Sequence, residues 1–185
     1  MVVKYAYMKK LLLRRNLTLP KKSFLLFGPR GTGKSTLINQ TIENAYLINL
    51  LKSSQYLPLS QNPSLLRDWL GHLKPGNWVI IDEVQKIPLL LDEVHALYEE
   101  KGLHFALTGS SARKLKRGGA NLLAGRALQN YLFPMTYTEY QTVSNINEVI
   151  DWGSLPGVIM DKVNRIETLS TYVESYLKQE LIEEG

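Results

Sequence analysis

The sequence predicts an α/β domain in which helices cover both faces of a mainly parallel sheet. Three observations lead to this fold class. Five apolar stretches of strand length alternate with stretches of helix length, a glycine-rich segment follows the first apolar stretch, and two carboxylates end the third. Because strands joined through helices run parallel, we expect the chemically active residues to gather where the carboxyl ends of the strands meet.

A glycine-rich segment at residues 28–36 carries the clearest chemical signal. It fits the P-loop spacing G-x-x-x-x-G-K-[ST] between the apolar run 23–27 and a helical stretch at 35–42. In a P-loop, backbone N–H groups and a helix dipole surround nucleotide phosphates, Lys34 reaches the β- and γ-phosphates, and Ser35 ligates Mg²⁺. A chance glycine-rich turn is the alternative, which the flanking elements disfavour. The predicted binding residues are Gly28, Pro29, Arg30, Gly31, Thr32, Gly33, Lys34, Ser35 and Thr36.

The segments around this loop follow from periodicity and helix-breaking residues. Residues 4–16 are expected to form a basic helix, and 17–20 connect it to the first strand. Residues 45–50 are a second strand. The polar segment 52–63 contains two prolines, so we predict a loop or short turns there. Leucine and tryptophan at i, i+4 spacing predict a helix over 64–73, which a following proline and glycine end.

Two carboxylates end the third strand, which spans residues 78–83. Asp82 and Glu83 follow four apolar residues, so a parallel sheet brings them to the edge where the P-loop also lies. We therefore assign Ser35 and Asp82 to Mg²⁺ and Glu83 to the acceptance of a proton from an attacking water. This is the Walker B pattern. The alternative is a helix N-terminus, which favours acids because of its dipole.

The next elements continue the same alternation. Apolar residues at helical spacing predict a helix over 89–101, and 103–108 is a fourth strand. Ser110 follows that strand, where a small hydroxyl beside the γ-phosphate is suited to sense it by hydrogen bonding. Ordinary capping of a helix at 111–117 is the alternative for the serines here. Residues 127–133 are the fifth strand, which a proline ends.

Helices dominate the last quarter of the chain. Thr136 and Glu139 have the spacing of a capping box, which predicts a short helix within residues 135–142. We expect a further helix at 146–152. After a turn containing glycine and proline, a long polar helix with one apolar side is expected at 163–183.

Composition excludes several classes of protein. The chain has 185 residues, enough for one well-cored domain, and contains no cysteine, which excludes disulfides and thiolate metal sites and fits the reducing cytoplasm where we expect it. Its three histidines show no metal-ligand spacing. No run of 18 or more apolar residues occurs, so no membrane span is expected.

Positive charge is concentrated in two clusters of a chain whose formal net charge is +5. Basic clusters are typical of nucleic-acid contacts, although a solvated helix face is the commoner explanation. The residues that would contact DNA or RNA are Lys9, Lys10, Arg14, Arg15, Arg113, Lys114, Lys116 and Arg117.

Five motifs together resemble one known family more specifically than the P-loop alone. They lie at residues 26–35, 81–88, 107–111, 123–126 and 132–140. This combination is similar to that of AAA+ P-loop ATPases, in particular the branch of bacterial and archaeal predicted ATPases in which an AAA domain precedes a C-terminal domain of unknown function.

The resemblance implies a three-layer P-loop sandwich with sheet order 5-1-4-3-2, a short C-terminal helical extension, and ATP as the nucleotide. It also implies that Ser110, with Thr108 as second choice, is the first sensor. Arg126 falls where an arginine would reach the γ-phosphate of a neighbouring subunit, which would make the protein a homo-oligomer. A salt bridge within the domain is the alternative for Arg126.

These expectations divide the chain into a basic N-terminal helix and connector at 1–20, an AAA+-like core at 21–142, and a partial helical extension at 143–185. The expected function is Mg²⁺-dependent ATP binding and hydrolysis, with the nucleotide state coupled to a partner. The catalytic candidates are Lys34, Glu83, Ser110 and Arg126. The alternative function is an ATP-dependent, nucleic-acid-associated adaptor or switch with little turnover of its own.

Overall fold

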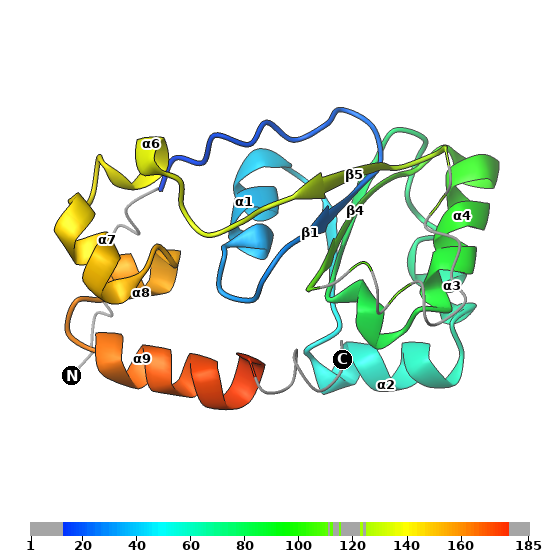
Figure 1. Cartoon of the computed structure of the whole chain (residues 1–185). Helices are drawn as coiled ribbons and strands as arrows, with labels where there is room; N and C mark the ends of the chain where they lie inside the picture. Colours follow the sequence, from blue (N-terminus) through cyan, green and yellow to red (C-terminus); the bar gives the residue numbers. More distant parts are fainter. Residues whose placement is uncertain (1–12, 111, 113–114, 116–122, 124, 178–185) are drawn as a thin grey trace, which may run out of the picture.

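A five-stranded parallel sheet forms the centre of the molecule (Figure 1). The computed structural model describes residues 13–110, 112, 115, 123 and 125–177. The strands are β1 (Phe24–Phe27), β2 (Tyr46–Asn49), β3 (Trp78–Asp82), β4 (His104–Gly109) and β5 (Leu128–Tyr131). Their order is β2-β3-β4-β1-β5 and every neighbouring pair is parallel. Read from the other edge, this order is 5-1-4-3-2, so the predicted topology is confirmed.

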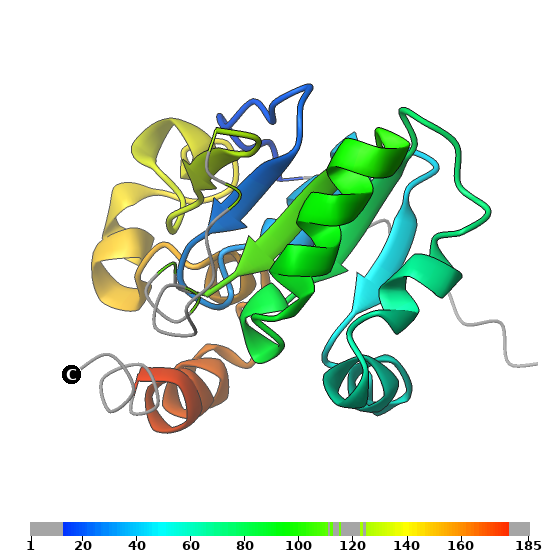
Figure 2. The ribbon, with the colours of Figure 1, turned by 90° about the vertical axis from the view of Figure 1, so that its right-hand side faces the viewer.

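Helices cover both faces of this sheet, with α1 on one side and α3 and α4 on the other (Figures 1 and 2). The described helical segments are α1 (Lys34–Thr41), α2 (Ser53–Gln61), α3 (Leu65–Trp69), η1 (Val84–Lys86), α4 (Leu90–Lys101), α6 (Tyr137–Tyr140), α7 (Ile146–Trp152), α8 (Pro156–Met160), α9 (Arg165–Tyr172) and the π-helix η2 (Val173–Leu177). The predicted three-layer arrangement is therefore confirmed. Within the described residues, no helix is long and apolar enough to span a bilayer.

The central strand β1 shows how the sheet separates two cores. All four of its residues are buried, as expected for a strand covered on both faces. Phe24 and Leu26 pack with Ile38 of α1 in one cluster. Leu25 and Phe27 belong to the larger cluster on the opposite face, which includes residues of α2, α3 and α4. Side chains alternate along a strand, so one short apolar run supplies both cores.

Residues 52–63, predicted as a loop, contain a helix instead. The helix α2 includes Pro58, which lacks the N–H for one helical hydrogen bond. The carbonyl of Pro58 nevertheless accepts from the N–H of Asn62 at 2.9 Å, and Leu59 is completely buried in the larger core. Burial of this side chain compensates for the missing bond, so tertiary packing overrides the local signal.

Several other boundaries differ from the prediction. The helix predicted at 64–73 ends at Trp69, because residues 70–72 form turns, and β5 is shorter than 127–133. The capping box of α6 and the helix at 146–152 are confirmed. The helix predicted at 163–183 consists of α9 followed by η2, and residues 178–183 lie outside the described part. The predicted helix at 111–117 is also largely outside it.

The predicted basic helix at 4–16 is not helical where it is described, at residues 13–16. The physical reason lies far away in sequence. The carboxylate of Glu139 accepts hydrogen bonds from the backbone N–H of Asn16 at 2.7 Å and from the side chain of Arg15 at 3.0 Å. These contacts fix the segment against α6, so its backbone takes a tertiary partner in place of a helical one.

Replacement of Gly28 by alanine should destabilise the fold strongly. Gly28 has a φ of 146°, and a Cβ there would lie 2.0 Å from the carbonyl oxygen of Leu132. Positive φ and steric overlap together should lower the free energy of unfolding by about 2–5 kcal/mol. Gly76→Ala is the matched control, because Gly76 has a φ of 82° with no atom within 4 Å. It should cost about 1–2 kcal/mol. Denaturant unfolding measures both, and equal losses would contradict the predicted overlap.

Candidate nucleotide-binding site

The carboxyl ends of three adjacent strands converge on one edge of the sheet. β1 pairs with β4 so that Phe27 lies opposite Gly109, and β3 pairs with β4 so that Ile81 lies opposite Leu107. The P-loop leaves the end of β1, while the acid pair and the hydroxyl residues leave the ends of β3 and β4. The parallel register therefore gathers segments that are distant in sequence around the start of α1.

Lys34 is folded into the P-loop that precedes it. Its ammonium donates to the carbonyl oxygens of Gly28 at 2.7 Å and Pro29 at 2.9 Å, and the residue is 5% exposed. Gly33, directly before it, caps α1 in the left-handed conformation with a φ of 88°, which favours glycine. The loop thus turns sharply into the helix and leaves the N-terminus of α1 facing the pocket.

The carboxylate of Asp82 joins the P-loop to the neighbouring strand. Its Oδ1 accepts from the hydroxyl of Ser35 at 2.7 Å and also from the hydroxyl of Thr108. The hydroxyl of Thr108 in turn accepts from the backbone N–H of Glu83 at 3.0 Å. Asp82 is 6% exposed and Thr108 is fully buried. Four residues from three separate segments therefore form one hydrogen-bonded chain.

These oxygens fit the chemistry of Mg²⁺ better than that of a transition metal. Among the described residues there is no group of three or more His, Cys, Asp or Glu that could hold a metal ion. Ser35 and Asp82 instead offer two hard oxygen ligands side by side, which matches an ion that keeps several waters and takes further oxygens from phosphates.

The backbone of Glu83 is strained, and its side chain is held by Gln85. Glu83 has a φ of 63°, a value that non-glycine residues rarely adopt. The amide nitrogen of Gln85 donates to Glu83 Oε2 at 2.5 Å and lies 3.4 Å from the hydroxyl of Ser110. The sequence argument assigned Gln85 no separate role. Its position in η1, two residues after Glu83, is the signal that would have indicated one.

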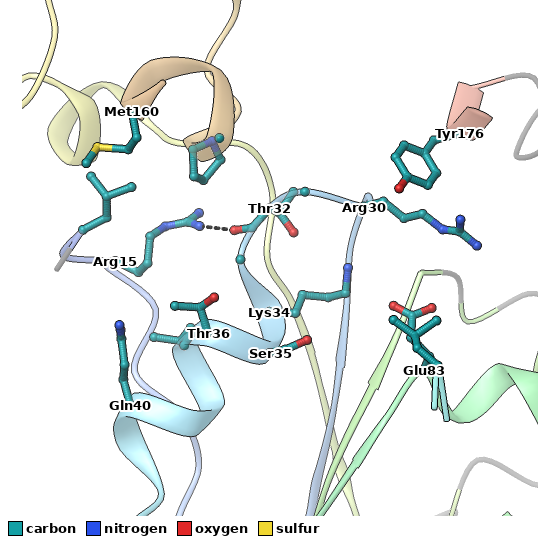
Figure 3. A pocket seen from close by; sticks show the side chains of 17 residues that line it. Arg15, Arg30, Thr32, Lys34, Ser35, Thr36, Gln40, Glu83, Met160 and Tyr176 are labelled. Atoms are coloured by element: carbon teal, nitrogen blue, oxygen red, sulfur yellow. Dashed lines mark hydrogen bonds between the residues drawn. The ribbon is translucent and has the colours of Figure 1, made fainter. Parts of the chain in front are cut away.

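These residues border a pocket of about 550 Å³, a size typical of small-molecule sites (Figure 3). Arg30 to Thr36 and Glu83 line it, whereas Gly28, Pro29, Asp82 and Ser110 lie outside its lining. Its remaining walls contain residues that the sequence argument missed: Leu13, Arg15, Leu37, Gln40, Leu51, Pro156, Gly157, Met160 and Tyr176. The N-terminal segment and the C-terminal helices therefore complete a pocket begun by the P-loop.

The C-terminal helical segments also contact the P-loop directly. The guanidinium of Arg30 lies 4.9 Å from the centre of the Tyr176 ring, a cation–π arrangement. A Cβ at Gly31 would be 3.8 Å from Leu155 and 3.9 Å from Tyr172. Tyr176 belongs to η2, so this element lies beside the loop at the mouth of the pocket (Figure 3).

Arg15 is buried against the P-loop and does not belong to a nucleic-acid surface. Its side chain is 6% exposed and forms an ion pair with Glu139, whose side chain is 4% exposed. It also donates to the carbonyl oxygens of Thr32 at 2.6 Å and Phe133 at 2.7 Å. The prediction for Arg15 is therefore wrong, because its charge is already satisfied inside the protein.

The other basic candidates are placed as follows. Arg14 is exposed. Lys9, Lys10, Arg113, Lys114, Lys116 and Arg117 lie outside the described residues.

Arg126 does not line the pocket. Its side chain is 40% exposed and donates to Glu99 on α4. This hydrogen bond from Arg126 lowers the pKa of the Glu99 carboxyl, against a smaller opposing effect of burial. Arg126 lies just before the first residue of β5, whereas the P-loop follows the last residue of β1. Because these two strands are parallel, Arg126 lies at the amino ends of the strands and the P-loop at their carboxyl ends.

The carboxyl of Glu139 is adapted to remain charged inside the protein. Burial raises its pKa, but the backbone N–H groups of Asn16 and Thr136 and the guanidinium of Arg15 all donate to it. These contacts outweigh burial, and the pKa of Glu139 lies below its ordinary value of 4.5.

Comparison with known proteins gives one family and two informative relatives. The family described as AAA domain matches residues 20–141. An uncharacterized protein of Methanocaldococcus jannaschii is 34% identical over 134 residues, which cover 65% of this chain and 28% of the relative. The RuvB subunit of the Holliday junction branch migration complex of Leuconostoc mesenteroides is 39% identical over 70 residues, which cover 38% of this chain and 19% of that subunit. The chain thus spans less than a third of these relatives.

Acid should remove the stability that the Arg15–Glu139 pair provides. Because the folded-state pKa of Glu139 lies below 4.5, the contribution is complete above that pH and is lost as the pH falls through the folded-state value. At neutral pH, Glu139→Gln should lower the free energy of unfolding by about 3 kcal/mol, since the Arg15 charge loses its partner. Denaturant unfolding across pH measures the difference, which should shrink below pH 4.5. A difference independent of pH would contradict this assignment.

Proposed function

Because this chain belongs to the AAA domain family, we propose that it binds and hydrolyses ATP in a Mg²⁺-dependent reaction and couples its nucleotide state to a partner. We place the ATP-binding core at residues 21–142, which the family match over 20–141 supports. The observation that carries the proposal is the hydrogen bond between Ser35 and Asp82, beside Glu83, in a pocket whose floor is the P-loop.

The pocket has separate regions suited to the two ends of a nucleotide. Its phosphate end consists of residues 30–36, where backbone N–H groups and the start of α1 favour anions. Lys34 would exchange the loop carbonyls for the β- and γ-phosphates, which are stronger acceptors. Leu13, Leu37 and Met160 also line the pocket and offer apolar surface that suits a base.

The residues at the strand ends supply the chemistry. Ser35 and Asp82 would hold Mg²⁺, which when bound neutralises charge on the phosphates. Glu83 would accept a proton from the water that attacks the γ-phosphoryl group. Ser110 and Thr108 are the sensor candidates. Thr108 contacts Asp82 directly, whereas Ser110 is connected to Glu83 through Gln85.

We extend the proposal to Arg126 as a finger for a neighbouring subunit. Its place at the opposite edge of the sheet excludes its own pocket, so a γ-phosphate that it reaches would belong to another copy of the chain. Its bond with Glu99 would have to open first. The alternative role of Arg126 is the salt bridge with Glu99 within the domain. Only the finger role requires the chain to assemble into an oligomer.

A second candidate function is a nucleic-acid-associated ATP switch with little turnover. The similarity to RuvB, a subunit named for Holliday junction branch migration, favours it. Arg14, Lys21 and Lys22 are exposed cations on the described surface, but the loss of Arg15 from this set weakens the argument.

Two variants separate binding from hydrolysis. Glu83→Gln should retain ATP affinity and lose at least about 100-fold in turnover, because an amide cannot accept the proton. Lys34→Ala should lose binding, because the phosphate charge then faces no ammonium. Titration with a fluorescent ATP analogue and a phosphate-release assay measure the two properties. Glu167→Gln, the same charge change on the exposed surface of α9, is the control. Normal turnover by Glu83→Gln would exclude Glu83 as the base.

ATP turnover measured with and without duplex DNA, over a range of protein concentrations, tests assembly and the choice of partner. Specific activity that rises with concentration and disappears in Arg126→Ala, with ATP binding retained, is expected for a finger acting between subunits. DNA affinity that falls steeply with salt would favour the switch, because bound cations release counterions. Activity independent of protein concentration would contradict the assembly proposal, and absent or salt-insensitive DNA binding would contradict the nucleic-acid proposal.

A further inference from the structure

We infer that Arg15 is a positioning residue for the P-loop: by holding the carbonyl oxygen of Thr32, it fixes the direction of the Gly33 N–H toward bound phosphate. The inference rests on the proposed binding of a nucleotide at this loop. Arg15 lies outside the P-loop motif and reaches it from the N-terminal segment (Figure 3).

Each donor group of the Arg15 guanidinium has a different segment as its partner. One terminal nitrogen donates to Thr32 in the P-loop at 2.6 Å, and the other donates to Phe133 after β5 at 2.7 Å. Nε donates to Glu139 in α6 at 3.0 Å. The planar fork of arginine permits these contacts simultaneously, which a lysine ammonium on a flexible stem does not reproduce. Arg15 therefore fixes the loop relative to two other parts of the chain.

The link from Arg15 to the pocket follows from the planar peptide. In a trans peptide the C=O and the next N–H point in opposite directions, and the described chain contains no cis bond. A Thr32 oxygen held toward Arg15 therefore keeps the Gly33 N–H directed away from Arg15. This peptide can otherwise rotate, since the glycine at position 33 adopts positive and negative φ with similar ease. An external restraint has most effect at such a residue.

Other contacts restrict the same turn. Thr32 is fully buried, and its hydroxyl donates to the carbonyl oxygen of Pro29 at 2.9 Å. Glu139 holds Arg15 in place while it also accepts from the backbone of Asn16 and Thr136. A buried ion pair adds little net stability over an apolar pair of similar volume, so fixed geometry is what this arrangement supplies.

ADP binding by purified variants tests the inference. Arg15→Met should weaken ADP binding about 10- to 100-fold, the equivalent of one hydrogen bond to a charged group. Arg15→Lys should recover only part of the affinity, because it keeps the charge without the fork. Arg67→Met is the control. Arg67 forms ion pairs with Glu93 and Glu100 on α4, and none of these three residues lines the pocket.

A second variant and a spectroscopic measurement distinguish positioning of the P-loop by Arg15 from a purely structural role of this residue. Arg15→Met combined with Glu139→Gln removes both buried charges, so thermal stability should recover while ADP affinity remains low. In ¹H–¹⁵N spectra without nucleotide, the Gly33 amide should shift or broaden in Arg15→Met and stay unchanged in Arg67→Met. Affinity that follows thermal stability in all variants, with an unchanged Gly33 amide, would overturn the inference.

The Lys34→Ala variant, measured in the same ADP titration, shows whether a negative result concerns only the role of Arg15 or also the proposed nucleotide binding. If Lys34→Ala weakens ADP binding and Arg15→Met does not, only the role of Arg15 is lost. If Lys34→Ala binds ADP as well as the wild type does, nucleotide binding at the P-loop is itself wrong, and the role of Arg15 falls with it.

Discussion

The parallel pairing of β1 with β4 determines where the P-loop and the strand-end residues of the site lie. It places the P-loop, which leaves β1, beside the hydroxyl of Thr108 at the end of β4. Because β3 pairs in parallel on the other side of β4, Asp82 reaches both Ser35 and Thr108. A single carboxylate therefore connects the loop with the adjoining strand ends. The two apolar clusters pack the sheet against its helices, so the geometry of the strand ends depends on these cores.

The P-loop is itself held from several directions by later parts of the chain. Gly28 packs directly against the backbone of Leu132, and Arg30 contacts the ring of Tyr176. Lys34 closes the loop from inside, while Arg15 holds its outer side. A loop rich in glycine loses much conformational entropy when it is ordered, and these contacts restrict it before a ligand arrives. The nine-residue motif thus depends on segments more than a hundred residues away.

Features of the fold that depend on neighbouring residues were predictable from the sequence, whereas features that depend on contacts between distant residues were not. The strands were predictable because a buried parallel strand is a local apolar run, as in Phe24–Phe27, while the strand order came from the family resemblance. The α2 helix was missed because burial of Leu59 overrides Pro58, and burial is not visible locally. Arg15 was misinterpreted for the same reason, since its partner Glu139 lies 124 residues away. The contact of Gln85 with Glu83 depends on the left-handed backbone of Glu83, although the spacing of two residues already placed Gln85 nearby.

The groups proposed for binding and those proposed for hydrolysis differ in how they are held. Lys34 and Ser35 already face the pocket, and their present partners lie in or next to it. Glu83, in contrast, is engaged by Gln85, and Arg126 is engaged by Glu99 at the far edge of the sheet. The proposed binding of nucleotide with Mg²⁺ requires new partners for Lys34, Ser35 and Asp82, all of which lie in or beside the pocket. The proposed action of Arg126 requires a bond to open at the end of the sheet opposite the P-loop. On the proposed function, the contacts within one chain therefore favour binding of nucleotide over its hydrolysis.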